Sequence, residues 1–212
     1  MTRRSCGAAG PFRGSRLRPT VAAALLLVLP GVACAQHPAG AAGAHGHAAI
    51  PEDATFTAAD VAFMQGMIAH HAQAIHMSRM AATHEADPRL GRLASKIAQS
   101  QVAEIRIMQD WLLRNGQVAP DTSSWRTMHM DGMLTAAQLE ALDGAAGPAF
   151  DRAFLTLMIQ HHEGALQMVE ALFAVRGAGQ DVDVSVFAND VVSVQTAEIG
   201  AMRRMLSQLP DR

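Results

Sequence analysis

The 212-residue sequence contains no tyrosine and only two cysteines, Cys6 and Cys34, both close to the N-terminus. The first 35 residues are typical of an export signal. Several arginines precede an apolar run at 21–29 that is too short to span a bilayer, and Ala-Cys-Ala at 33–35 has the form of a cleavage site. We therefore expect a mature chain without disulfides or thiolate ligands, in which any metal binding depends on His, Met, Asp or Glu.

Basic residues are scarce once this segment is set aside. It holds five of the 17 basic residues and none of the 19 acidic ones, so its removal changes the net charge from −2 to about −7. An acidic chain lacks the basic surface that nucleic acid or anionic lipid requires. We expect no nucleic-acid partner, no transmembrane segment after signal cleavage, and a periplasmic or extracellular location. Lipoprotein anchoring at Cys34 is the less favoured alternative, because glycine stands where that signal favours leucine.

Helix-forming residues dominate the rest of the chain. Residues 36–55 are rich in Ala, Gly and Pro and predict a flexible leader, whose histidines are weak candidates for capturing Cu(II): His37, His45 and His47. From residue 57 onward, Ala, Leu, Met, Gln and Glu recur with helical periodicity. Capping signals and helix breakers predict long helices over about 58–84, 88–115, 148–177 and 183–208, and a short helix that begins near residue 135.

The two halves of this helical region repeat each other. Residues 60–77 and 151–168 share nine identities in 18 positions. Residues 101–112 and 195–206 share six identities in 12 positions. Each half is expected to be a helical hairpin that buries its apolar face against the other. We predict an all-α, ferritin-like four-helix bundle made of two repeated hairpins with a long crossover: domain 56–208, with repeat one at 57–115, the crossover at 116–147 and repeat two at 148–208.

The repeated segment carries His and Met at helical spacing. In each copy a stripe of Phe, Met, His, Ala and Met should face the bundle core, and a second His lies about 100° further round the helix. Burying imidazole costs free energy unless it is hydrogen-bonded or bound to metal. The pattern predicts a metal site whose donors are Met67, His70, His71, Met77, Met158, His161, His162 and Met168. The alternative is a core in which methionines fill space and the histidines are structural.

The softness of these donors indicates copper. Thioethers and imidazoles without thiolate suit Cu(I), and the histidines can also hold Cu(II). Zinc gains little from methionine, and no Glu has a His three residues later, as ferritin-type di-iron sites require. Glu104 and Glu198 either orient ligating histidines or lie on a solvated face. The crossover carries a further group that is either a second soft site or a packed loop: Met128, His129, Met130 and Met133.

The doubled motif also carries a family resemblance. Met-Ile-x-His-His-x-x-Ala-(Ile/Leu)-x-Met, followed in each half by Gln-x-x-Glu-Ile-x-x-Met, resembles the DUF305 family, which includes CopM-like periplasmic copper-binding proteins. The resemblance covers roughly residues 56–208. It implies a ferritin-like bundle, an exported location and a role in copper binding or tolerance, with the motif positions as ligands.

Three functions are compatible with these patterns. The favoured one is a non-enzymatic copper-binding protein, a metallochaperone or buffer, whose partners are the metal ion and another copper-handling protein. A metal-dependent oxidoreductase and a metal-free helical interaction module are the alternatives. Nothing in the sequence resembles a Ser/His/Asp triad, a cysteine nucleophile or a phosphate loop, so an enzyme without metal has no candidate residues.

Overall fold

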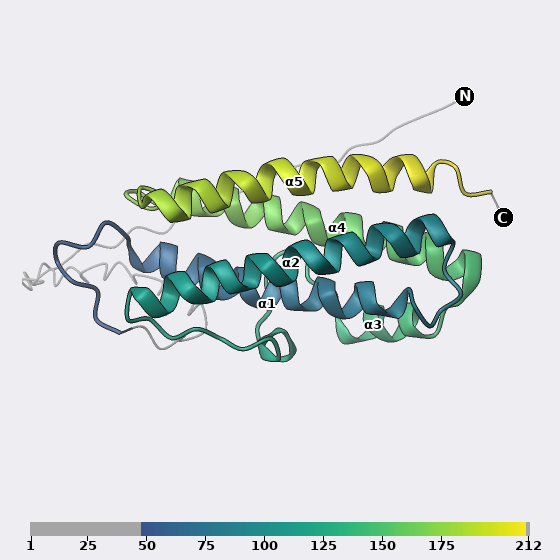
Figure 1. Ribbon diagram of the computed structural model, residues 1–212, viewed down its shortest axis with the longest axis horizontal. Helices are drawn as coiled ribbons and strands as arrows, with labels where there is room; N and C mark the ends of the chain where they lie inside the picture. The colour runs from purple at the N-terminus through teal and green to yellow at the C-terminus, as the bar shows by residue number, and fades with distance from the viewer. Residues whose placement is uncertain (1–47, 211–212) are drawn as a thin grey trace, which may run out of the picture. The chain divides into compact units, whose positions relative to one another are not determined.

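The computed structural model describes residues 48–210, and its secondary structure in this range is entirely helical (Figure 1). Four long helices form the bundle: α1 (Ala58–Met80), α2 (Pro88–Arg114), α4 (Gly147–Ala174) and α5 (Val182–Leu206). The crossover between α2 and α4 contains a short 3-10 helix, η1 (Ser124–Arg126), and α3 (Ala136–Asp143). The predicted all-α bundle is confirmed. The predicted signal segment, Cys34 and the three leader histidines lie outside the described residues.

Local sequence signals define where the helices begin. The Thr57 hydroxyl accepts a hydrogen bond from the Asp60 amide while the Asp60 side chain accepts one from the Thr57 amide, and Thr135 with Gln138 repeats this capping box at α3. The helix α1 ends at Met80, before the predicted residue 84, because the amides of the next three residues, 81–83, donate hydrogen bonds three residues back instead of four. The other boundaries lie within about three residues of those predicted.

The two hairpins meet through α1 and α4. The helix α1 packs against α2, α4 packs against α5, and the main contact between the hairpins is that of α1 with α4. Figure 1 shows that α4 runs opposite to α1. The crossover lies along these two helices, because η1 contacts α1 and α3 contacts α4. Equivalent positions of the two repeats are therefore brought face to face where α1 and α4 meet.

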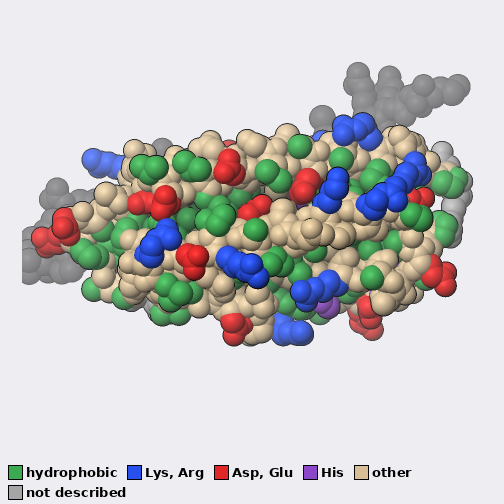
Figure 2. Space-filling model, in the orientation of Figure 1, with side chains coloured by type: hydrophobic (Ala, Val, Ile, Leu, Met, Phe, Trp, Pro, Cys, Tyr) green, Lys and Arg blue, Asp and Glu red, His purple; other side chains and the backbone are tan. Residues whose placement is uncertain are grey.

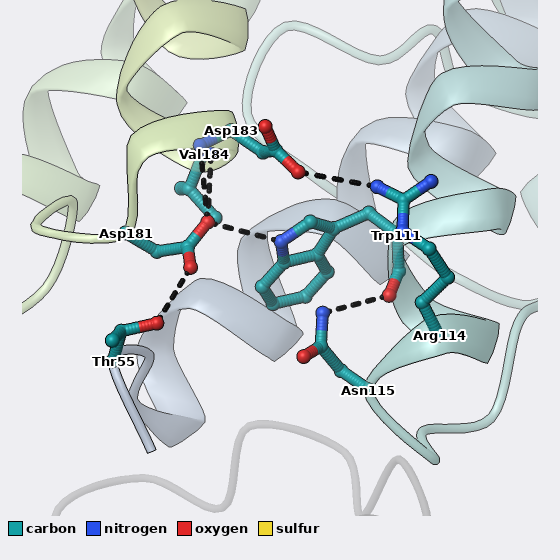
Figure 3. A network of polar contacts seen from close by, with 7 residues as sticks. All are labelled: Thr55, Trp111, Arg114, Asn115, Asp181, Asp183 and Val184. Carbon is teal, nitrogen blue, oxygen red and sulfur yellow. Dashed lines mark hydrogen bonds and ion pairs between the residues drawn. The ribbon is translucent and has the colours of Figure 1, made fainter.

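A polar network holds the start of α5 against the end of α2 (Figure 3). Asp181 caps α5 by accepting hydrogen bonds from the Asp183 and Val184 amides, and it also accepts one from the Trp111 indole at 3.1 Å and one from the Thr55 hydroxyl at 2.8 Å. Burial alone would raise the pKa of Asp181, but these hydrogen bonds outweigh it and lower the pKa. The cap explains why a valine-rich segment begins a helix here despite its β propensity.

The described part of the predicted leader lies against the bundle. Besides the bond from Thr55, the Ala48 amide donates a hydrogen bond to the Gln117 side chain, and Phe56 packs edge-on against Trp111 with ring centroids 5.2 Å apart. Among the helices of residues 48–210, none combines the length and hydropathy that a membrane crossing needs.

Candidate metal centre

Two histidines face each other where α1 and α4 meet. His70 on α1 and His161 on α4 are both fully buried, and their ring centroids lie 3.8 Å apart with an angle of 41° between the ring planes. His71 and His162, each next in sequence, are also fully buried, with ring centroids 6.4 and 6.3 Å from those of their neighbours. The contact between the hairpins thus gathers all four predicted histidines into one buried group.

Three of these imidazoles have their orientation fixed by an acceptor. His71 Nε2 lies 2.6 Å from the Glu104 carboxylate on α2, and His162 Nε2 lies 2.8 Å from the Glu198 carboxylate on α5. His70 Nε2 lies 3.2 Å from the backbone carbonyl of Asp131 in the crossover. Because each partner is an acceptor, Nε2 carries the proton, and in the neutral ring Nδ1 then holds a free lone pair. Of the two readings of Glu104 and Glu198, the contacts support that of orienting residues.

The remaining ring nitrogens have no hydrogen-bond partner within the described chain. This holds for Nδ1 of all four histidines and also for Nε2 of His161. A buried acceptor without a partner costs about 1–3 kcal/mol, so four such imidazoles together represent a substantial destabilisation of the metal-free protein. A ligand that accepts electron pairs from nitrogen would relieve this cost.

Burial also keeps the central pair uncharged. Desolvation lowers the pKa of His70 well below its ordinary value, and the nearby rings of His71 and His162 lower it further. Desolvation likewise lowers the pKa of His161, reinforced by His70, His162 and His71. Neutral imidazole is the form that binds metals, so at neutral pH the two central rings need lose no proton before they bind.

The predicted methionines divide between the two halves of the hydrophobic core. Met67 belongs to the half of the core that contains Ala165, and Met168 packs against that same half. Met77 and Met158 belong to the other half, together with Ala74. Met67, Met77 and Met158 are fully buried, whereas Met168 is half-buried. Each half of the core therefore supplies thioethers from both α1 and α4.

The crossover brings a further thioether close to α1. A Cβ atom at Gly66 would lie 3.0 Å from the Met130 sulfur and 3.4 Å from the terminal methyl of Met168, so both side chains reach the same point one turn before His70. The Met133 sulfur accepts a hydrogen bond from the Met130 amide at 3.3 Å. Met130 and Met133 thus lie on the bundle beside the predicted site, while Met128 is half-buried and His129 is exposed.

Two glycines inside helices make this approach possible, and the sequence interpretation did not use them. A Cβ at Gly164 would clash with the backbone of Asp131 and Gly132, so only glycine lets the crossover rest on α4 and present the Asp131 carbonyl to His70. Gly66 similarly leaves room for Met130. An isolated glycine costs a helix about 1 kcal/mol relative to alanine and usually has a packing reason, which is the signal that identifies such contacts.

The predicted metal donors are imidazole nitrogens and thioether sulfurs. Within residues 48–210, no group of three or more His, Cys, Asp or Glu side chains is arranged so that they could hold a metal ion by themselves. On the face shown in Figure 2 histidine is almost absent, in keeping with the full burial of the four site histidines.

The fold and this centre together define a class of protein, an all-α bundle of two repeated hairpins that enclose four histidines between them. The chain belongs to the DUF305 family, because the model of that family, described as a domain of unknown function, matches residues 60–206. No curated protein matched the sequence.

Solved structures of the same family resemble this chain over most of its length. A DUF305 fragment from Deinococcus radiodurans is 30% identical, covers 73% of this chain and 99% of its own, and superposes with a TM-score of 0.62. A family protein from Streptomyces coelicolor, provisionally described as secreted, is 29% identical, covers 71% of this chain and 93% of its own, and gives a TM-score of 0.61. CopM in its Cu(I)-bound form is 29% identical, covers 70% and 95%, and gives a TM-score of 0.56. CopM is also known in Cu(II)-bound and silver-bound forms.

Proposed function

We propose that this protein is an exported, non-enzymatic copper-binding protein that holds Cu(I) in the bundle core for buffering, transfer or tolerance. The observation that carries the proposal is the set of buried, unpartnered ring nitrogens at four histidines, in a bundle with methionines in both halves of its core: His70, His71, His161 and His162. Imidazole and thioether together are donors that favour Cu(I) over harder ions. The copper-bound and silver-bound forms of CopM support the same choice of metal.

The proposed donor set keeps the eight residues predicted from the sequence. His70 and His161 supply the central nitrogens, and His71 and His162 supply nitrogens oriented by carboxylates of the outer helices. Met67 with Met168, and Met77 with Met158, supply thioethers in the two halves of the core. Met130 is an additional thioether that the crossover places near the first of these sets. Bound copper would gain a low-dielectric, closed site from which water is excluded.

The metal preference is the first testable consequence. We expect Cu(I) to bind more tightly than Zn(II), because the methionines add donors that only the softer ion uses well. A competition titration of the purified, untagged protein against a chromogenic Cu(I) chelator measures this, with a parallel zinc titration. Equal retention of the two ions, or failure to compete for Cu(I), would contradict the proposal.

The carboxylates that orient the outer histidines give a second test. In Glu104→Gln with Glu198→Gln, we expect Cu(I) affinity to fall by about 10- to 100-fold, because the neutral amide oxygen is a weaker acceptor than the carboxylate and no longer strengthens the donor nitrogen of each imidazole. The matched control is Glu140→Gln with Glu170→Gln, which removes the same charge from exposed positions. If both double variants lose affinity equally, the effect is one of net charge, and the orienting role is wrong.

A further inference from the structure

A cavity lies away from the histidine centre, against the first hairpin. It has a volume of about 390 Å³ and is enclosed by α1, α2 and the crossover segment around η1. Its floor is apolar and consists of Ala72, Ile75, Val102 and Ile105. A cavity of this size with an apolar floor is sufficient for a small organic molecule.

The rim of the cavity carries positive charge in a protein whose charge is otherwise negative. Three arginines from three different elements line it: Arg79 on α1, Arg106 on α2 and Arg126 on η1. None of them forms an ion pair with another residue in the range 48–210, and no Asp or Glu lines the cavity. In Figure 2, basic side chains lie around a histidine along the lower edge of the molecule, over α1 and η1. An anion is the ligand that this rim would attract.

An aromatic wall completes the cavity. The Trp125 ring stacks on the His76 ring with centroids 4.9 Å apart and an angle of 25° between the planes, and the Arg126 guanidinium lies 4.6 Å from the Trp125 centroid. Trp125 is therefore held by a contact on α1 and by its own neighbour, and the uncovered edge of its half-buried ring lines the cavity.

The crossover segment that closes the cavity is anchored to the helices. Gln109 on α2 donates a hydrogen bond to the Pro120 carbonyl at 2.9 Å, and Gln65 on α1 donates one to the Val118 carbonyl at 2.8 Å. The nearby Asp121 carboxylate accepts hydrogen bonds from the Ser123 amide and hydroxyl, both at 2.6 Å. This carboxylate, which precedes the lining residues Thr122 and Ser123, is thus engaged within its own turn.

We propose that this cavity binds a small aromatic carboxylate. Guanidinium groups bind a carboxylate with paired hydrogen bonds, while the apolar floor and the edge of the Trp125 ring accommodate a flat ring. An inorganic anion would use the arginines but leave the floor exposed to water, and a neutral aromatic would leave the arginines unused. The proposal does not depend on copper, because none of the cavity residues belongs to the proposed donor set.

The test is calorimetric titration of the purified protein with benzoate, and with benzyl alcohol as the neutral counterpart. We expect benzoate to bind with a Kd of about 1 mM or lower and benzyl alcohol to bind at least tenfold more weakly. In Arg79→Gln with Arg106→Gln, which leaves the Trp125 wall intact, benzoate affinity should fall at least tenfold. The control, Arg89→Gln with Arg92→Gln, removes the same charge from α2 outside the cavity and should retain benzoate binding.

Folding of both double variants is checked by circular dichroism, and the arginines concerned lie on the surface of helices. No heat of binding with benzoate, equal binding of benzyl alcohol, or the same loss in the control variant would each overturn the proposal. Because Cu(I) binding can be measured on the same samples, loss of benzoate binding and loss of Cu(I) binding can be distinguished.

Discussion

His70→Leu with His161→Leu is expected to abolish tight Cu(I) binding while leaving the free energy of unfolding of the metal-free protein unchanged or up to about 2 kcal/mol higher. The two rings are fully buried, and three of their four nitrogens have no partner in the described chain. Replacing such groups by apolar side chains of similar size removes a desolvation cost instead of creating one. The fourth nitrogen contacts the backbone carbonyl of Asp131, and the loss of that one hydrogen bond offsets part of the gain.

Copper affinity should fall at least 100-fold in the same variant, because the two central donors are lost. Urea unfolding of the metal-free protein and a Cu(I) competition titration, made on one preparation, measure both effects. His129→Leu serves as the control, since it removes an exposed imidazole outside the donor set and should leave both quantities unchanged. A large loss of stability with Cu(I) binding retained would identify the central histidines as structural residues and remove the basis of the metal centre.

The helices were predictable because their signals are local. Thr57 with Asp60 and Thr135 with Gln138 are capping boxes in the sequence and in the structure, and Asp87 followed by Pro88 begins α2 as expected. The turn that ends α1 was not predictable, since the residues after Met80 still have helical propensity. The chain leaves the helix through hydrogen bonds that run three residues back and a positive φ of 54° at Glu85. Contacts with the crossover hold this turn in place, since the Gly147 amide donates a hydrogen bond to the His84 carbonyl at 2.8 Å and His84 Nε2 lies 2.9 Å from the Asp143 carbonyl.

The repeat predicted which residues meet, but not what covers them. Two copies of one motif on antiparallel helices place equivalent positions face to face, which is the observed arrangement of His70 and His161. The crossover has no counterpart in the repeat, so the sequence pattern could not predict its contacts with the helices. These contacts are that of the Asp131 carbonyl with His70 and that of the Met130 sulfur with Gly66. The pattern could not predict the cavity beside Trp125 either, because its arginines come from three separate elements.

The response of Cu(I) binding to pH separates the nitrogen donors from the sulfur donors. Imidazole must be neutral to bind metal, whereas a thioether does not titrate. Without burial, protons would compete below about pH 6.5. The lowered pKa values of His70 and His161 shift the onset of competition at the central pair to lower pH. Below the pH at which competition begins, we expect Cu(I) affinity to fall by about tenfold per pH unit for each central histidine that binds. Weaker Cu(I) binding should persist at Met130 and Met133.

The same lowered pKa values make the free energy of unfolding of the metal-free protein depend on pH. Because the folded state keeps these histidines neutral while the unfolded chain accepts protons below about pH 6.5, the free energy of unfolding should decrease as pH falls from that value towards the lowered pKa. Cu(I) competition titrations and urea unfolding at several pH values between 7 and 4.5 therefore give two independent readings of the same groups. The free energy of unfolding should stop falling at the pH where the folded histidines themselves take up protons. A Cu(I) affinity that stays flat below that pH would show that the central histidines are not donors.

Replacing the thioethers should lower the whole affinity profile without changing its shape. In Met67→Leu with Met158→Leu, the buried volume is nearly kept and the imidazoles remain, so we expect weaker Cu(I) binding at every pH with the same dependence on protons. Met108→Leu with Met202→Leu is the matched control, because these methionines are equally buried repeat equivalents on α2 and α5. If the control loses as much affinity as the test variant, the loss comes from repacking of the core; if neither loses any, sulfur does not bind the metal and the preference for Cu(I) needs another cause.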